Sequence, residues 1–274
     1  MNTVPRDVQV SGKRLRVWNG GTGPALLLLH SAYGDAELSW EPVWDELGAS
    51  FTVIAPDLPG FGASEPLEQP SLAAMAKAIK ELLDVQKVDR AIIVGNSFGA
   101  AIAIEFALSY PERALCIVLV NGGYMPVLPR FVKKLVSMPA VEKHARAFAK
   151  NMVYSNKAFE KAFARPAKLP PLFFDRIRKN EEKQARLVFD AFMLQTEPQR
   201  RPTMPITMIW GTEDNLLTMD KAKTIRNWLG KPDFMAIDGA GHMPQIEQPR
   251  RFVEIMRKIG KKSGIPSGFS SRAR

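Results

Sequence analysis

A serine between two glycines follows an apolar run, in the segment GNSFG at positions 95–99. Residues 91–94 before it are typical of a buried strand, and the alanine-rich residues 100–108 after it are typical of a helix. A turn of this kind can be sharp enough to hold a strained serine backbone and expose its hydroxyl oxygen. The context predicts that Ser97 is a catalytic nucleophile. The alternative is an incidental serine in a glycine-rich turn.

The base that such a serine needs is expected among the histidines, because a serine hydroxyl is a poor nucleophile at neutral pH. The chain has three of them, His30, His144 and His242. Only His242 follows Ser97 in a glycine-rich loop, GAGH at 239–242, directly after a predicted strand. We therefore expect His242 to be the base.

The acid that would orient this histidine is expected after another strand, in the segment WGTED at 210–214. A carboxylate at Asp214 would accept the imidazole N–H of His242, set its tautomer and stabilise the imidazolium. The neighbouring Glu213 is the alternative for this role. Ser97, Asp214 and His242 are thus the predicted catalytic residues.

Alternating strands and helices must position these side chains, and this alternation requires a mostly parallel sheet with helices on both faces. The predicted strands span residues 8–10, 15–18, 25–29, 52–55, 91–94, 114–120, 206–210 and 234–237. The predicted helices span residues 38–47, 72–83, 100–108, 219–229 and 249–259. The first two strands form a hairpin, which adds an antiparallel edge to the sheet.

The pattern changes for about eighty residues after Gly123, where Lys, Phe, Met and Ala recur at helical spacing without strand-like runs. We expect a core of residues 1–122 and 201–260, a helical cap of residues 123–200 and a basic flexible tail of residues 261–274. A cap inserted after the sixth or seventh strand would lie above the carboxyl ends of the strands. Ligands of open α/β sheets bind at those ends.

The order of the three predicted catalytic residues resembles the serine-nucleophile branch of the α/β-hydrolase superfamily. Two further segments match that family: DLPGFGAS at 57–64, and Gly241-His242 followed by Glu247 and Pro249. The resemblance spans about residues 8–260 and implies the α/β-hydrolase fold with an inserted cap. Asp57 precedes the nucleophile in the chain, so we expect it to stabilise a turn rather than to take part in catalysis.

The resemblance also implies an oxyanion hole made of two backbone N–H groups, which stabilise charge on the substrate carbonyl oxygen. The expected donors are Phe98, which follows the nucleophile, and Ala32 in the loop after the third strand. Family members usually have His-Gly where this chain has His30-Ser31. Ser31 would either change the geometry of this loop or add a hydroxyl to the pocket. His30 is expected to be structural rather than a second base.

Three functions fit these residues. The preferred one is hydrolysis of a carboxylic ester or related acyl bond through an acyl-enzyme. The second is hydrolysis of a carbon–carbon bond in a ring-fission dienoate, because GNSFG and the loop at 30–40 resemble enzymes of that kind. The third is a non-catalytic ligand-binding member of the fold, which an intact triad disfavours.

Contacts to the substrate separate the first two functions. The ring-fission hydrolases use a cap arginine for the substrate carboxylate, and Arg176 or Arg178 could serve here. Both could equally lie on a solvated helix face among many cap cations. Met243 stands where those enzymes tend to carry tryptophan, which disfavours the dienoate. The expected substrate contacts are Ser31, Tyr33, Arg176, Arg178 and Met243.

The net charge of +10 is concentrated in one segment. Residues 130–186 contain 15 Lys and Arg against 5 Asp and Glu, so this segment carries the whole excess. These cations either cover solvated helix faces or attract an anionic substrate or an anionic surface. No recognition-helix or aromatic-basic pattern accompanies them, so nucleic acid is not an expected partner.

Other composition features limit the possible classes. Cys116, the single cysteine, lies in an apolar run and is expected to be buried. No stretch resembles a signal peptide or reaches the roughly 18 apolar residues of a membrane span, which favours a cytoplasmic enzyme. The spacing of the histidines does not suit a metal, and no cofactor is expected. A small molecule, with an anionic one left open, is the expected partner, and the oligomeric state is left open.

Overall fold

Eight strands form one sheet in the computed structural model, which describes residues 3–124, 127–170, 172–196 and 200–262. Their order across the sheet is β1-β2-β4-β3-β5-β6-β7-β8. The strands are β1 (Val4–Val10), β2 (Lys13–Gly20), β3 (Ala25–Leu29), β4 (Thr52–Pro56), β5 (Ala91–Asn96), β6 (Ala114–Val120), β7 (Ile206–Gly211) and β8 (Asp233–Ile237). β1 pairs antiparallel with β2 and β2 with β4, whereas all other neighbours are parallel. The predicted mostly parallel sheet with an antiparallel edge is confirmed.

The central strands are buried on both faces, which explains their continuous apolar sequences. Leu27 of β3 pairs with Ile93 of β5, which pairs with Ile117 of β6, and all three are fully buried. Alternate residues point to opposite faces, so each strand supplies both layers of the core.

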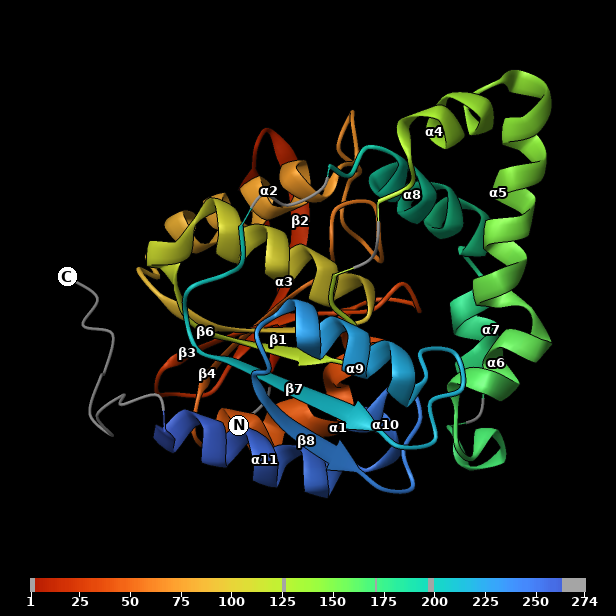
Figure 1. The fold of residues 1–274 in the computed structure, drawn as a ribbon. Coiled ribbons are helices and arrows are strands. Elements are labelled where there is room, and N and C mark those ends of the chain that lie inside the picture. Colours follow the sequence, from red (N-terminus) through yellow and green to blue (C-terminus); the bar gives the residue numbers. More distant parts are fainter. Residues whose placement is uncertain (1–2, 125–126, 171, 197–199, 263–274) are drawn as a thin grey trace.

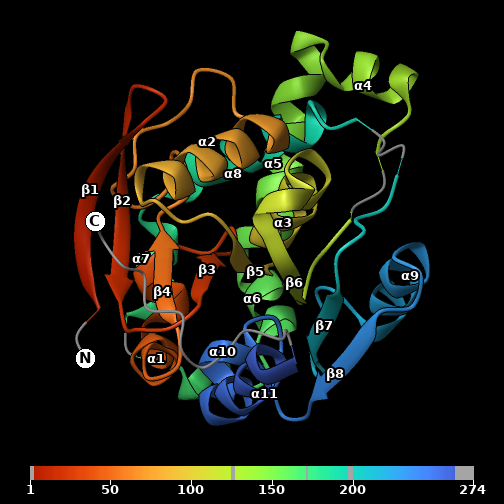
Figure 2. The ribbon, with the colours of Figure 1, turned by 90° about the vertical axis from the view of Figure 1, so that its left-hand side faces the viewer.

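Helices cover the two faces of the sheet (Figures 1 and 2). One face packs on α1 (Ala36–Gly48) and α11 (Pro249–Lys262), with Trp40 and Phe252 in its core. The other packs on α2 (Leu72–Val85), α3 (Phe98–Ser109) and α9 (Met219–Trp228). Short helices η1 (Pro111–Arg113) and α10 (Pro244–Glu247) lie in connections. No described helix has the length and apolar character that crossing a bilayer requires.

Between β6 and β7 the chain forms a separate group of helices, which we call the cap (Figure 1, green to teal). The cap contains α4 (Arg130–Val136), α5 (Pro139–Tyr154), α6 (Asn156–Ala162), η2 (Pro166–Lys168), α7 (Phe173–Arg178) and α8 (Glu181–Met193). At the other end of the chain, α11 continues through Lys262, past the predicted start of the tail. Residues 263–274 of that expected tail lie outside the described residues.

A buried aromatic cluster joins the cap to the core. Tyr33 of the core packs against Tyr154, Phe159 and Phe163 of the cap, with ring centroids 5.6–5.9 Å apart. Two hydrogen bonds cross the same contact: Tyr33 Oη donates to Val153 O at 2.9 Å, and Tyr154 Oη donates to Ala32 O at 2.7 Å. This part of the cap is therefore fixed to the core.

Candidate active site

Ser97 occupies a strained turn between β5 and α3. Its backbone has φ 52° and ψ −107°, a conformation that non-glycine residues rarely adopt. A Cβ on Gly95 would lie 2.3 Å from Gly99 O, and one on Gly122 would lie 2.6 Å from Ser97 Cα. Only glycine allows these backbones to approach so closely. Ser97 is the N-cap residue of α3 but makes no capping hydrogen bond with its side chain.

His242 and Asp214 are in direct contact. His242 Nδ1 lies 2.7 Å from Asp214 Oδ2, and the two residues are only 2% and 3% exposed. The competing carboxylate of Glu213 is exposed to solvent. The structure thus pairs the expected base with the expected acid, at loops that follow β8 and β7.

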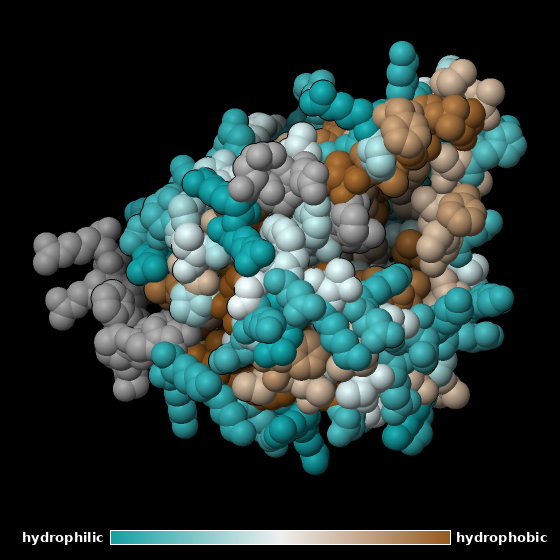
Figure 3. Space-filling model, viewed as in Figure 1, coloured by the Kyte–Doolittle hydropathy of each residue, from teal (hydrophilic) through white to brown (hydrophobic). Residues whose placement is uncertain are grey.

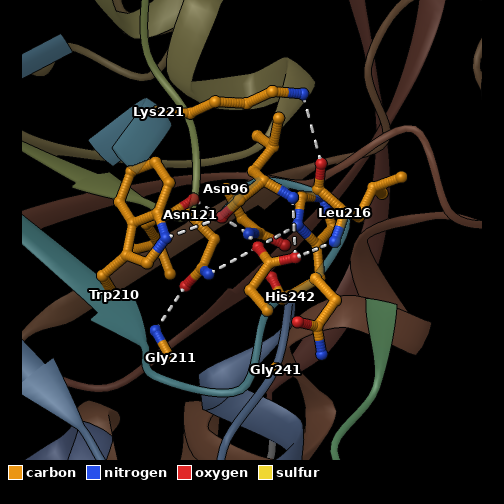
Figure 4. A network of polar contacts seen from close by, with 12 residues as sticks. Asn96, Asn121, Trp210, Gly211, Leu216, Lys221, Gly241 and His242 are labelled. Carbon is orange, nitrogen blue, oxygen red and sulfur yellow. Dashed lines mark hydrogen bonds and ion pairs between the residues drawn. The ribbon is translucent and has the colours of Figure 1, made fainter. Parts of the chain in front are cut away.

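Asn121, which the sequence analysis did not select, holds the carboxylate of Asp214 in place (Figure 4). Its Nδ2 donates to Asp214 Oδ2 at 2.7 Å, and its Oδ1 accepts from Gly211 N at 2.9 Å. Asp214 Oδ1 also accepts from the backbone N–H groups of Leu216 and Leu217, each at 2.9 Å. Together with His242 Nδ1, four donors therefore orient one buried carboxylate.

A second buried amide, Asn96, ties the loop of His242 to the strand that carries Ser97. Asn96 Nδ2 donates to Val120 O and to His242 O, both at 3.0 Å, and its Oδ1 accepts from Gln245 Nε2 at 3.1 Å (Figure 4). Because Asn96 directly precedes Ser97, these bonds bring the loop of His242 against the turn of Ser97.

The cap contributes to the same loops through its segment 161–164. His242 N donates to Ala162 O at 2.6 Å, and Asn215 N donates to Lys161 O at 2.8 Å. Glu247 accepts from Gly241 N at 2.9 Å with Oε1 and from Ala164 N at 2.7 Å with Oε2. Burial raises the pKa of Glu247. The loops of His242 and Asp214 are both attached to one short piece of the cap.

His30 fixes the peptide group that contains the expected oxyanion donor. His30 Nδ1 lies 2.7 Å from Ser31 O, and Leu58 N donates to His30 Nε2 at 2.9 Å. Since Nε2 accepts, Nδ1 carries the proton and donates. Ser31 C=O and Ala32 N–H belong to one planar trans peptide, so this bond sets the direction of the N–H. His30 is fully buried and structural, as expected.

The hydroxyl of Ser31 forms a hydrogen bond within its own loop. Ser31 Oγ accepts from Tyr33 N at 3.0 Å. This hydrogen bond closes a short turn of a kind that serine commonly forms. The second expected donor, Phe98, is the first residue of α3, where a backbone N–H has no acceptor within the helix.

The buried imidazole of His30 predicts a pH dependence of stability. Burial lowers the pKa of His30 from its ordinary 6.5 to about 4. The unfolded chain therefore binds more protons between these values, so the stabilising contribution is full above pH 6.5 and is lost as pH falls to 4. His30→Gln removes this titration. We expect the variant to be less stable than the native protein, and the difference in free energy of unfolding to grow by at most about 3 kcal/mol from pH 4 to 7.

Urea unfolding at several pH values measures this difference. Burial raises the pKa of Asp57 to about 6. Asp57 titrates in both proteins, so its contribution cancels in the comparison. Asp57 accepts from Ala36 N and Ala63 N, which agrees with its expected turn role. A deficit that does not change with pH would show that His30 is not buried in its neutral form.

The expected substrate contacts lie in two different places. The Tyr33 ring centroid is 5.9 Å from that of His242, and both Tyr33 and Met243 are buried in the aromatic cluster. Arg176 instead pairs with Glu37 at 2.8 Å, and Arg178 contacts Asn156 and the Phe159 ring. Both guanidinium groups are thus bound at the exposed surface, Arg176 to a core carboxylate and Arg178 to cap residues, and not to Asp214 or His242.

Aromatic side chains contact Phe98, the residue that follows Ser97. The Phe98 ring lies 5.9 Å from that of Phe61 and 5.8 Å from that of Phe192, which belongs to α8 of the cap. A cavity of about 430 Å³ lies elsewhere, between residues 68–70 and helices α4, α5 and α8, and its lining does not include Ser97, Asp214 or His242. No cluster of potential metal ligands occurs in the part of the chain that the structure describes.

Comparison with known proteins settles the family. Residues 26–255 match the model of the alpha/beta hydrolase family. The chain belongs to this family. The turn of Ser97, the paired histidine and aspartate loops and strands β4 to β8 lie within the matched residues of this hydrolase, whereas β1 and β2 precede them.

Two relatives of the hydrolase match it over more than nine-tenths of its length. An uncharacterised protein of Mycobacterium tuberculosis is 29% identical over 91% of this chain and 79% of the relative. The 2-hydroxymuconate semialdehyde hydrolase of Pseudomonas sp. is 26% identical over 92% of each chain.

Solved structures share the fold. A putative lipase from Acinetobacter baumannii has a TM-score of 0.77 and 20% identity over 95% of this chain and 92% of its own. A meta-cleavage product hydrolase from Pseudomonas fluorescens has a TM-score of 0.74 and 20% identity over 94% and 98%. At these identities the likeness shows the fold alone.

Proposed function

We propose that this hydrolase cleaves a carboxylic ester or related acyl bond of a small molecule with Ser97, His242 and Asp214. The observation that carries this proposal is the 2.7 Å contact between His242 Nδ1 and Asp214 Oδ2, in a loop bonded to the residue that precedes Ser97. An imidazole held in this way has its Nε2 available as a base.

The reaction proceeds in two halves. The Ser97 oxygen attacks the carbonyl carbon and passes its proton to His242 Nε2, and Asp214 stabilises the imidazolium that forms. The N–H groups of Ala32 and Phe98 bind the oxyanion. The imidazolium then protonates the leaving alcohol, which departs and leaves an acyl-enzyme. Water, deprotonated by His242, releases the acid and restores Ser97.

The surroundings of Ser97 favour an apolar acyl group. Phe98, the residue after Ser97, packs between the rings of Phe61 and Phe192, so the side chains next to this turn are aromatic. The two arginines that could bind a substrate carboxylate are held elsewhere, with Arg176 paired to Glu37 at 2.8 Å. An uncharged ester therefore matches the described side chains better than an anionic dienoate.

Cleavage of a carbon–carbon bond in a dienoate is the second candidate. It is supported by the similarity to 2-hydroxymuconate semialdehyde hydrolase, which extends over 92% of both chains. In this case a cap arginine would have to leave its present partners and turn toward the substrate.

A substrate panel separates the two reactions. Short and long aryl esters are compared with a ring-fission dienoate for native protein, Arg176→Ala, Arg178→Ala and the control Lys179→Ala on the same helix end. We expect a preference for esters and changes in kcat/KM within about threefold for every variant, since exposed ion pairs contribute little. A dienoate preference that falls tenfold or more only in an arginine variant would favour carbon–carbon hydrolysis instead.

A further inference from the structure

Large apolar side chains are exposed on one face of the cap. They are Phe131 and Leu135 of α4, Met138 between the helices, and Phe148 and Met152 of α5, with exposed fractions of 75%, 53%, 52%, 66% and 55%. We call these five residues the cap patch. Within each helix the two members are four residues apart and so share a face. Figure 3 shows apolar side chains gathered at the upper right, over α4 and α5.

The outward face of α5 contains Lys143 but no carboxylate. Its exposed residues at spacings of three and four are Ala140, Lys143, His144, Ala147, Phe148, Asn151 and Met152. Carboxylates of α5 and α8 are paired with two other cations of α5: Glu142 and Asp190 with Arg146 at 2.6 Å, and Glu181, at 3.0 Å, and Glu182 with Lys150.

Three cations flank the cap patch without acidic partners. Arg130, Lys134 and Lys143 are exposed, and none forms an ion pair within the described residues. They belong to residues 130–186, whose 15 Lys and Arg against 5 Asp and Glu give the chain its excess charge. The face therefore combines exposed aromatic and aliphatic groups with uncompensated positive charge.

This combination matches a surface that is apolar beneath and anionic above. Aromatic and aliphatic side chains partition into the boundary between headgroups and acyl chains, and neighbouring Lys and Arg bind anionic headgroups. A second copy of this chain is a poorer occupant, because a twofold contact through the patch would bring the same cations together.

We propose that the cap patch docks this hydrolase on an anionic phospholipid surface, with Phe131 and Phe148 inserted and Arg130, Lys134 and Lys143 at the headgroups. This association does not depend on the proposed esterase reaction, since the five apolar residues and the three cations lie outside the residues assigned to catalysis.

Flotation with vesicles tests this proposal, using phosphatidylcholine alone and phosphatidylcholine with one third phosphatidylglycerol. We expect the native protein to bind the vesicles that contain phosphatidylglycerol and to be released as salt is raised.

Two double variants remove the two contributions separately. The variant Phe131→Ser with Phe148→Ser should weaken binding about tenfold or more, because apolar burial is lost. Lys134→Glu with Lys143→Glu should weaken it similarly at low salt. The matched controls, Val85→Ser and Lys258→Glu with Lys261→Glu, lie outside the cap and should bind as the native protein does.

A fluorescent probe gives a second measurement that needs no destabilising change. Met152→Cys can be labelled selectively because Cys116 is buried. A polarity-sensitive dye at this position should shift to the blue with anionic vesicles only. No binding to either vesicle, or equal binding by the patch and control variants, would overturn the proposal. Self-association that the phenylalanine variants abolish, without vesicle binding, would also overturn it and assign the patch to a second copy of the chain.

Discussion

Ser97→Ala is expected to lower turnover by roughly 10⁴- to 10⁶-fold while leaving the protein folded. The chemical reason is the loss of the only atom that can form the acyl-enzyme. Stability should change little, within about 0.5 kcal/mol, because Ser97 makes no capping hydrogen bond with its side chain. Alanine also meets the same backbone strain that serine already bears at φ 52°.

Two measurements check this result. Hydrolysis of the preferred aryl ester gives the rate, and mass spectrometry after reaction with a fluorophosphonate should find one adduct, on Ser97. Ser109→Ala is the control, since Ser109 lies at the far end of the same helix and its hydroxyl donates to Glu105 of that helix. More than about one per cent residual activity, or an adduct on another residue, would mean that Ser97 is not the nucleophile.

Patterns along the chain were sufficient for the sheet and for the choice of His242 among the histidines. Strands β3, β5 and β6 are short apolar runs bounded by turn residues, which is a local signal. Three histidines left few choices for a base, and only His242 had a suitable loop. The choice between Asp214 and Glu213 needed the structure, where one carboxylate is buried against the imidazole and the other is exposed.

Exposed edges were harder to predict than buried strands. β1 begins at Val4 rather than at the expected residue 8, because its first residues are solvent-exposed and owe their strand conformation to pairing with β2. α1 begins at Ala36, two residues earlier than expected, because the Asp35 side chain accepts from Leu38 N and caps the helix. Both features depend on partners rather than on hydrophobic periodicity.

The polar residues that support the site left no periodic signal. Asn121 meets Asp214 across 93 residues of sequence, and Gln245 meets Asn96 across 149. An asparagine after a buried strand is compatible with an ordinary turn, so its role follows only from which loops the fold brings together. For the same reason, the surface partners of Arg176 and Arg178 could not be foreseen.

Asp214→Asn is expected to lower kcat by roughly 10³- to 10⁴-fold. Asp214 Oδ1 accepts from two backbone N–H groups and Oδ2 accepts from His242 Nδ1 and Asn121 Nδ2. If the remaining oxygen of the amide stays on the backbone donors, its NH₂ group faces two other donors. The imidazole must then lose its Nδ1 proton and carry a proton on Nε2, where it cannot accept the proton of Ser97.

The same change should cost about 1–3 kcal/mol of stability, because the buried amide of Asn121 loses its acceptor. It cannot rotate to compensate, since its Oδ1 is needed by Gly211 N. Combining Asp214→Asn with Asn121→Asp restores an acceptor between the two loops but gives His242 no carboxylate. We expect this double variant to regain stability in urea unfolding but not ester turnover, with Glu213→Gln unchanged in both. Recovery of turnover in the double variant would show that Asp214 only holds its loop in place, and the orienting role assigned to its carboxylate would then be wrong.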